Sequence, residues 1–203
     1  MVTEIRIYIE GGGDSRSTKD ELRGGYRAFL QEIYGLASTK RIRCRIVMCG
    51  GRNSAFDDFK TAIQSHPQSF NVLLVDAEAP VLLTPWAHLQ QRDGWINPSV
   101  PDHHCHLMVQ LLEAWFLADK DALKSYYGQG FNPNPIPGNP NVEQIAKATV
   151  MTAMEIATRN TQKGEYRKIR DASRLLERIS PAVVRAKSPH CDRLFTELSE
   201  QIM

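Results

Sequence analysis

The sequence predicts an α/β protein with a central, mostly parallel sheet of about four strands, flanked by helices and followed by a helical C-terminal extension. Short apolar runs alternate with longer runs that repeat apolar residues at helical spacing, and glycines or acids stand where the apolar runs end. Strands alternating with helices are typical of parallel sheets joined by right-handed crossovers. At 203 residues the chain can form one well-buried domain with a small appendage.

Two strand–helix units are predicted first. Residues 4–9 (EIRIYI) alternate with period two, and three glycines separate them from an amphipathic helix that begins near Ser17 and has its apolar positions at Leu22, Tyr26, Phe29, Leu30 and Ile33. Residues 42–49 (IRCRIVMC) form the second predicted strand. It stops at a pair of glycines, and Ser54 is the expected N-cap of the helix that follows.

Two further strands are predicted before a proline-rich segment. Residues 70–76 (FNVLLVD) are almost wholly apolar, as in the middle of a covered parallel sheet. Residues 106–112 (HLMVQLL) are a fourth candidate strand and lead into a helix over 113–127. The segment 128–141 resembles a linker and helices follow it, so we expect an α/β domain over 1–127 with the extension 128–203 packed on it.

Composition excludes several classes of protein. The chain is 42% hydrophobic with a formal net charge of +2, which fits neither a disordered chain nor a strongly basic nucleic-acid coat. Its four cysteines lack C-x-x-C spacing, no signal-peptide pattern opens the sequence, and no apolar run approaches the roughly 20 residues that span a bilayer. We therefore expect a cytoplasmic protein with reduced thiols and no membrane contact.

Acidic residues and glycines follow all four predicted strands. Ligands of an open parallel sheet bind beyond the carboxyl ends of its strands. The residues there are Glu10, Asp14, Gly50, Gly51, Asp76, Glu78 and Glu113. Carboxylates gathered at one edge repel one another unless cations neutralise them, and hard oxygen ligands select Mg²⁺, with Mn²⁺ as a substitute. The glycines would let backbone approach a phosphate or a metal.

Each acid alone also has an ordinary explanation. Asp76 and Glu78 could be solvated turn residues, Asp14 could cap the following helix, and Glu113 could favour its own helix through the dipole. The joint pattern favours a site more strongly than any single member does.

Four motifs carry a family resemblance. I-E-G-G-G-D (9–14), C-G-G-R-N (49–53), L-L-V-D-A-E (73–78) and Q-L-L-E-A-W-F-L-A-D (110–119) resemble the Toprim fold of topoisomerases, primases and nucleases of the overcoming-lysogenization-defect type. More narrowly, the chain resembles a Toprim-like bacterial family of undefined function whose genes often lie near an ABC-type ATPase in mobile or defence loci.

The resemblance implies two metal ions. The first would lie between Glu10, Asp14 and Asp76, and the second near Glu78 and Glu113. The pair after the third strand is D-x-E where the family more often has D-x-D, and Leu111 stands where the family has the serine of S-x-E. The spacing of the first two acids is similar to the E-G-x-x-E element of the nucleases.

Basic residues complete the implied site. Arg52 and Asn53, with the glycines before them, could bind a phosphate oxygen, although a plain surface arginine is equally compatible. The run 163–173 resembles the family's basic element, so Lys168 or Lys163 is a candidate for transition-state stabilisation, against a solvated helix face. Basic stretches at 39–45 and 159–178 could follow a nucleic-acid backbone.

The resemblance implies a Mg²⁺-dependent nuclease or nicking subunit. We expect it to act on nucleic acid, DNA more than RNA, in phage defence or DNA processing, with a separate ABC-type ATPase and with homo-oligomer formation left open. The alternatives are a non-catalytic regulatory or nucleic-acid-binding module and a small-nucleotide phosphohydrolase. A zinc site at 101–106 lacks paired ligands, and a serine hydrolase at 13–15 lacks a late D-x-x-H. We expect Trp115 in the core, and Trp86 and Trp95 near the site.

Overall fold

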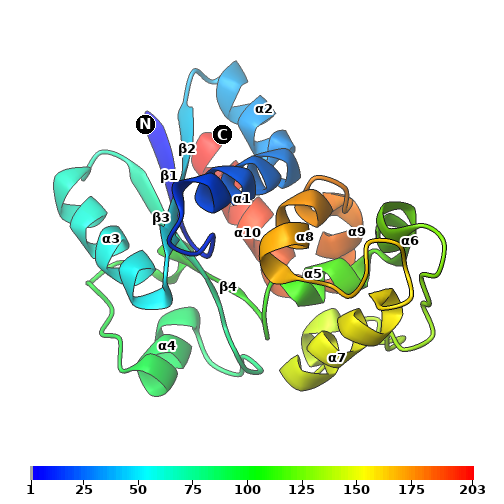
Figure 1. Cartoon of the computed structure of the whole chain (residues 1–203). Coiled ribbons are helices and arrows are strands. Elements are labelled where there is room, and N and C mark those ends of the chain that lie inside the picture. The colour runs from blue at the N-terminus through cyan, green and yellow to red at the C-terminus, as the bar shows by residue number, and fades with distance from the viewer. Residues whose placement is uncertain (1) are drawn as a thin grey trace.

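Four parallel strands form the centre of the molecule. The computed structural model describes residues 2–203 and shows a single sheet in the order β2-β1-β3-β4 (Figure 1). All three strand pairs are parallel, which confirms the predicted class. The strands are β1 (Glu4–Glu10), β2 (Arg43–Gly50), β3 (Phe70–Asp76) and β4 (Cys105–Met108).

The strand order creates a crevice between β1 and β3. From β1 the chain moves outward to β2 and then crosses to the other side of β1 for β3, so the direction of winding reverses between these two central strands. At the position where the strand order reverses, the two connections leave the sheet on opposite faces. Ligands of open parallel sheets bind beyond the carboxyl ends of the strands at this position. This position places the ends of β1 and β3 at the centre of any site.

Helices cover both faces of the sheet and extend beyond β4. In Figure 1, α3 and α4 lie on one face, whereas α1, α2 and α10 lie on the other. The helices are α1 (Arg16–Phe29), α2 (Gln31–Thr39), α3 (Arg52–Ser65), α4 (Pro85–Asp93), α5 (Glu113–Ala118), α6 (Lys120–Tyr127), α7 (Lys147–Thr158), α8 (Lys168–Leu176), α9 (Pro181–Lys187) and α10 (Pro189–Ile202), with short 3-10 turns η1 (Asp102–His104) and η2 (Val142–Gln144).

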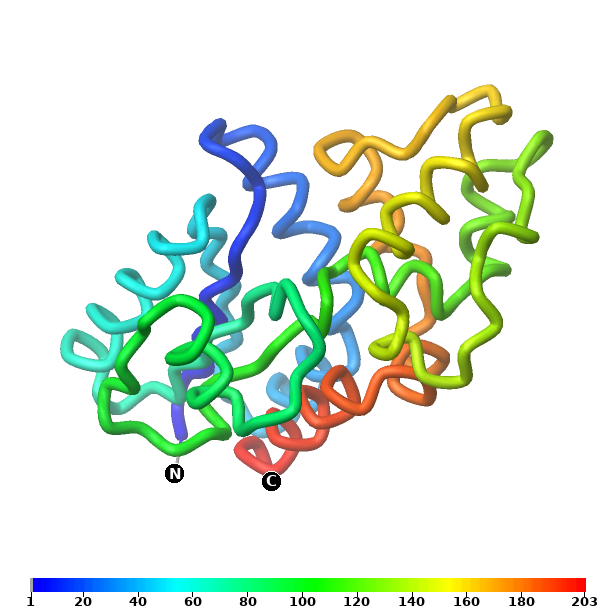
Figure 2. Tube along the Cα trace, turned by 90° about the horizontal axis from the view of Figure 1, so that it is seen from below, coloured from blue at the N-terminus to red at the C-terminus, as the bar shows by residue number. Residues whose placement is uncertain are grey.

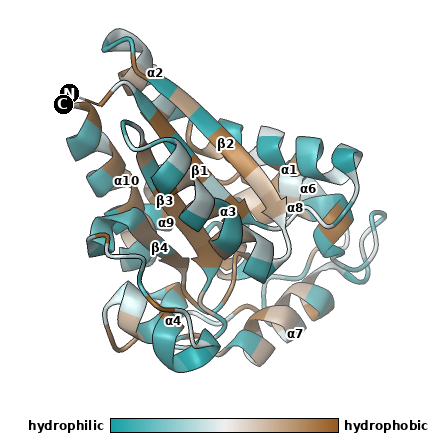
Figure 3. Cartoon of the chain, turned by 90° about the vertical axis from the view of Figure 1, so that its left-hand side faces the viewer, coloured by the Kyte–Doolittle hydropathy of each residue, from teal (hydrophilic) through white to brown (hydrophobic). Residues whose placement is uncertain are grey.

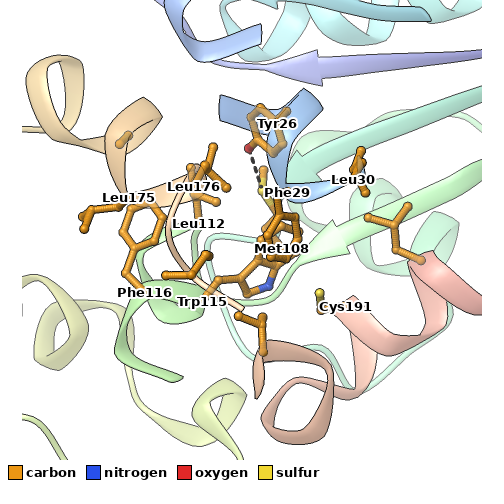
Figure 4. Close-up of a cluster of buried hydrophobic side chains, with 14 of the residues drawn as sticks. Tyr26, Phe29, Leu30, Met108, Leu112, Trp115, Phe116, Leu175, Leu176 and Cys191 are labelled. Atoms are coloured by element: carbon orange, nitrogen blue, oxygen red, sulfur yellow. Dashed lines mark hydrogen bonds between the residues drawn. The ribbon is translucent and has the colours of Figure 1, made fainter. Parts of the chain in front are cut away.

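The alternation of β1 divides the core into two clusters. Ile5, Ile7 and Ile9 point to the face covered by α1, α2 and α10, whereas Tyr8 belongs to the cluster under α3 and α4. In the larger cluster Trp115 is stacked on Phe29 with ring centroids 5.2 Å apart (Figure 4), which confirms Trp115 as a core residue. Figure 3 shows the result as apolar strands beneath helices with hydrophilic outer faces.

The other two tryptophans lie in the smaller cluster. Trp95 stacks on Phe56 with ring centroids 4.4 Å apart, and Trp86 packs against Phe59 at 5.8 Å. Both side chains are buried, so they stabilise the packing of α3 and α4 rather than stand open to a substrate.

The fourth strand is shorter than the sequence predicts. It ends at Met108 rather than at residue 112, because Gln110 adopts a positive φ of 64° and turns the chain. The Gln110 side chain accepts a hydrogen bond from the Lys147 amide and donates to the Glu143 carbonyl. Contacts with residues far along the chain therefore override the strand pattern.

Two predicted helices are each divided. The first breaks at Leu30 into α1 and α2, and the run 113–127 breaks at Asp119 into α5 and α6. Asp119 caps α6 by accepting from the Ala122 amide, and its other oxygen accepts from the Ser180 amide. The third helix begins at Arg52 with Gly51 as N-cap, so the expected Ser54 cap is wrong.

The C-terminal helices pack on the rest of the molecule. α8 lies against α1, and α10 contacts α2 and β4. The chain ends lie near each other at the end of the sheet away from the crevice (Figure 2). Within residues 2–203, no helix is both long and apolar enough to cross a membrane.

The contact between α1 and α8 allows a paired test. A Cβ added at Gly25 would lie 2.7 Å from the Ser173 carbonyl oxygen, whereas one at Gly24 meets nothing within 4 Å. We expect Gly25→Ala to lower the free energy of unfolding by about 1–3 kcal/mol through overpacking. Gly24→Ala should raise it by up to about 1 kcal/mol through helix propensity. Urea denaturation of both variants checks this, and equal effects would contradict the packing described.

Candidate functional site

Asp76 lies at the centre of the site. It ends β3, a strand whose residues are all buried, and it is itself only 3% exposed. Its Oδ1 atom accepts a hydrogen bond of 2.8 Å from the Leu112 amide, which the turn after β4 presents to it. Its Oδ2 atom lies 3.4 Å from the Lys168 ammonium. The side chain is thus held in one position by two segments distant in sequence.

Glu113 completes a buried acidic pair. It is the first residue of α5 and is fully buried. Its Oε1 atom accepts a 2.7 Å hydrogen bond from the Tyr166 hydroxyl and lies 3.9 Å from the Lys168 ammonium. Its Oε2 atom is buried and has no hydrogen-bond partner among residues 2–203. An unpaired buried carboxylate oxygen is costly, so this atom is available to a ligand that binds oxygen.

Arg52 holds Glu10, the third acid of the site. Its guanidinium bonds Asp93 through Nε at 3.0 Å and Nη2 at 2.7 Å, and its Nη1 donates to Glu10 Oε2 at 3.1 Å. Nη1 also donates to the main-chain carbonyl of Asp76. With its donors engaged in this way, Arg52 connects the ends of β1 and β3 to α4. These bonds give Arg52 a positioning role, and the expected phosphate contact stays a prediction.

The charges of the cluster shift one another's pKa values. Burial, with a further contribution from the charges of Glu113 and Glu10, raises the pKa of Asp76 to about 7 against the opposing effect of Lys168. Burial likewise raises the pKa of Glu10, partly offset by Arg52. Burial alone would lower the pKa of Lys168, but the carboxylates of Asp76 and Glu113 outweigh it and raise that pKa. Lys168 is therefore charged, and Asp76 titrates near neutral pH.

The glycines after β1 bring two strand ends together. Gly11 and Gly50 exchange main-chain hydrogen bonds of 2.8 and 3.1 Å. Both have positive φ, of 124° and 81°, which side-chain-bearing residues rarely adopt. Within residues 2–203 the amides of Gly12 and Gly13 have no hydrogen-bond acceptor, and both residues line a pocket beside Glu10. Successive free amides of this kind suit an anion such as phosphate.

Two predicted metal ligands lie outside this cluster. Asp14 is exposed, and Ser15 rather than Asp14 caps α1 by accepting from the Thr18 amide. Glu78 forms ion pairs with Lys147 and Arg92. Neither acid lines the pocket beside Glu10 and Asp76. The structure brings together Glu10, Asp76, Glu113 and Lys168 from the predicted set, and leaves these two acids apart.

The predicted phosphate-binding residues are also divided. Gly50 pairs with Gly11, and Gly51 caps α3. Asn53 is exposed and lines a different hollow, beside Phe56 and Trp95. The glycine turn after β1, rather than the one after β2, offers free amides to the crevice.

Glu10, Asp76 and Glu113 are the residues of the cluster that could supply oxygen ligands to a divalent ion. No group of three or more His, Cys, Asp or Glu side chains within residues 2–203 stands ready to hold a metal. Lys168 instead supplies the positive charge between Asp76 and Glu113. Glu113 Oε2 has no hydrogen-bond partner among residues 2–203, and burial raises the pKa of Asp76. A cation bound by these acids would have to take the place of the Lys168 ammonium.

The two basic stretches lie at different distances from the cluster. The stretch 39–45 leads into the start of β2, roughly 20 Å from Gly50 at a strand rise of about 3.3 Å per residue. The stretch 159–178 contains Lys168 itself and therefore borders the site. Lys163, the other candidate lysine, lies over the Tyr126 ring at 5.0 Å. Only the second stretch is placed to meet a strand bound at the acids.

Sequence reasoning missed the hydroxyl that orients Glu113. Tyr166 lies two residues before Lys168 in the same basic run, and it is 5% exposed. A buried tyrosine needs a partner for its hydroxyl, and an aromatic residue amid charges was the one signal available. The partner itself, 53 residues earlier, could not be read from the sequence.

Comparison with known proteins identifies a family. A family model described as a domain of unknown function (DUF4276) matches residues 9–199, so the chain belongs to that family. The match includes all the acids of the cluster and Lys168. No curated protein and no solved structure is detectably similar to the chain.

The pKa of Asp76 predicts how stability depends on pH. The pKa of Asp76 is about 7 in the folded protein, against the ordinary 3.8. Between about pH 4 and pH 7 the folded protein therefore retains a proton that the unfolded chain has released. The stabilisation is complete below about pH 4 and is lost as the pH rises towards about 7, at up to about 1.4 kcal/mol per pH unit. We expect Asp76→Asn to remove this slope in urea denaturation with EDTA present.

The exposed Asp57 provides the control for this measurement. Asp57→Asn should keep the wild-type dependence on pH. Identical pH profiles for the wild type and Asp76→Asn would show that Asp76 is ionised throughout, contrary to its burial.

Proposed function

We propose that this member of the DUF4276 family hydrolyses phosphodiester bonds in nucleic acid with the help of one divalent cation, Mg²⁺ or Mn²⁺. The observation that carries the proposal is the meeting of Asp76 and Glu113 at Lys168, with Glu10 held beside them by Arg52, at the crevice between β1 and β3. Two of these acids end strands, and the third begins α5. They match the donor preferences of Mg²⁺ and the charge needs of phosphate chemistry.

The fold supports the resemblance to Toprim proteins. Acids follow β1 and β3, a glycine ends β2, and a further acid begins the helix after β4, all on one parallel sheet. The resemblance implied two ions. Because Asp14 and Glu78 lie outside the cluster, our proposal retains one ion, with Glu10, Asp76 and Glu113 as its ligands.

Residues of the chain would divide the chemistry among them. When bound, the ion supplies Lewis acidity and lowers the pKa of a coordinated water. The amides of Gly12 and Gly13 can donate to a phosphate oxygen. Lys168, whose side chain is 52% exposed, has room to turn from Asp76 towards a phosphate, where its charge would stabilise the transition state. Arg52 and Tyr166 hold Glu10 and Glu113 in place.

Two features bear on the substrate and on any partner. The basic stretch 159–178 borders the site and could contact the phosphates of a polymer, for which we favour DNA over RNA. The chain contains no G-K-[S/T] motif, so ATP hydrolysis in the same process would come from another chain, such as the ABC-type ATPase that the resemblance implies.

One observation favours a non-catalytic alternative. Lys168 already pairs with Asp76 and Glu113, so the acids are partly neutralised without any metal. A regulatory or nucleic-acid-binding module with the same fold would keep this pairing permanently. Such a module would lack metal-dependent hydrolysis, and this difference decides between the two.

Hydrolysis assays test the proposal directly. Supercoiled plasmid, single-stranded DNA and RNA are incubated with the protein and Mg²⁺ or Mn²⁺. Glu10→Ala, Asp76→Asn and Lys168→Met should each lower the rate by about 100-fold or more, the scale for losing one charge-stabilising group. The exposed Asp57→Asn should have no effect. Equal rates for the wild type and the Glu10 and Asp76 variants would refute the proposal.

Further measurements test the number of ions and the class of substrate. Asp14→Asn and Glu78→Gln should each retain activity within about threefold if one ion suffices, since Asp14 is exposed and Glu78 pairs with Lys147 and Arg92. Turnover of a free nucleotide or a model phosphodiester, with all polymers left intact, would favour a small-nucleotide phosphohydrolase. Calorimetric titration with Mn²⁺ should give one site in the wild type and none in Asp76→Asn.

A further inference from the structure

A pocket opens beside the acid cluster, between α1 and α8. Its volume is about 130 Å³. Thr18, Leu22 and Tyr26, which are spaced by four residues, line it from one face of α1. Ile169 and Ala172 line it from α8. The pocket therefore lies between α1 and α8, next to the glycine loop that follows β1.

The interior of this pocket is apolar. Tyr26, Met108 and Leu112 come from three different elements and meet in the core (Figure 4), and all three also line the pocket. The Tyr26 hydroxyl is directed to Met108 Sδ at 3.2 Å, and its buried ring forms part of the pocket floor. An apolar cavity of about 150 Å³ accommodates one benzene-sized ring. The pocket is therefore about the size of one aromatic ring.

The rim of the pocket is polar and charged on one side. Glu10, Asp76 and Lys168 line that side together with the glycines whose amides are free. At the other end α1 and α8 touch, since Gly25 has no room for a Cβ beside Ser173. Ile169 is 71% exposed, although it belongs to the lining. An occupant must therefore present an apolar ring to the interior and an anionic or metal-binding group to the rim.

We propose that this pocket binds one unstacked base of a single-stranded segment, which places the adjoining phosphate at Gly12, Gly13 and Lys168. A nucleotide combines a flat ring and a phosphate one sugar apart, which matches an apolar pocket beside a charged rim. A purely apolar ligand would leave the lysine and the amides unused. The inference rests on the proposed function and names the substrate more narrowly, as single-stranded nucleic acid.

The geometry also explains why a duplex would be the poorer substrate. A base reaches such a pocket only after it leaves its stack and its pair, which costs a few kcal/mol in a duplex and little in a single strand. Apolar side chains such as Leu22 and Ile169, which line the pocket, would contact a base without reading its sequence. The pocket would therefore favour single-stranded over duplex nucleic acid, without a preference for particular bases.

Fluorescence anisotropy with two short strands tests this inference. One is a labelled oligothymidylate, and the other has the same length and phosphates but abasic sugars throughout. With Mn²⁺ present, we expect the wild type to bind the thymidine strand about tenfold or more tightly, the scale of one base stacked on a side chain. Strand integrity is checked on a denaturing gel after each measurement.

Two pocket variants and one control assign the preference to this pocket. Ala172→Leu fills the cavity and should reduce thymidine-strand binding to the abasic level. Ile169→Ala removes an exposed side chain without disturbing the core. It should lower the ratio of the two affinities, thymidine strand over abasic strand, at least threefold. Leu82→Ala, at a leucine that is also exposed but does not line this pocket, should keep the full preference for the thymidine strand.

The outcomes separate this inference from the proposed function. Equal binding of the two strands by the wild type, with metal-dependent cleavage intact, would overturn the base pocket alone. A preference that persists unchanged in both Ala172→Leu and Ile169→Ala would do the same. Failure to bind either strand, together with absence of cleavage, would overturn both.

Discussion

The negative charge of Asp76, buried at the end of a central strand, is the constraint on which the site depends. A buried carboxylate is destabilising by several kcal/mol unless hydrogen bonds and opposite charge compensate it. β3 brings Asp76 to the edge of the sheet between β1 and β4, where solvent reaches it least. The Leu112 amide and the Lys168 ammonium compensate part of the charge. The turn after β4 and the start of α8 are therefore placed by the same requirement.

The helical C-terminal region belongs to the site as much as the sheet does. Lys168 and Tyr166 reach across to Asp76 and Glu113 over sequence separations of 92 and 53 residues. α8 also packs directly on α1, at a point where only glycine fits. Removal of this region would expose the apolar side of α1, leave Glu113 without Tyr166 and Lys168, and leave Asp76 with the Leu112 amide alone.

Local patterns predicted the strands and the strand-end acids well. Residues 70–76 match β3, because an apolar run of that length between polar breaks has few alternatives. The end of β4 was predicted wrongly, because the positive φ of Gln110 depends on contacts with Glu143 and Lys147. Such contacts between distant residues leave no periodic signal in a single sequence.

The site residues show the same division. Strand ends predicted that Glu10 and Asp76 meet, since neighbouring parallel strands end at one edge. Beyond the end of a strand, side chains no longer alternate between the two faces, so the pattern does not predict where they point. Glu78 points to Lys147 rather than to the other acids. The glycine turn after the second strand predicts the position of Arg52 correctly. Its pairing with Asp93, 41 residues later, leaves no local pattern.

Charge balance relates the protonation of the site to its proposed metal. Glu10, Asp76 and Glu113 face one lysine, whereas Arg52 is offset by Asp93, so full ionisation leaves an excess of two negative charges. One divalent cation carries that charge. Without it, the chain retains a proton on Asp76 up to a pKa of about 7, which removes half of the excess. The proton and the ion thus compete for the same carboxylate, and a hard cation would displace the proton as the pH rises. A permanently neutral, purely structural cluster would have been obtained more simply with one acid and one lysine.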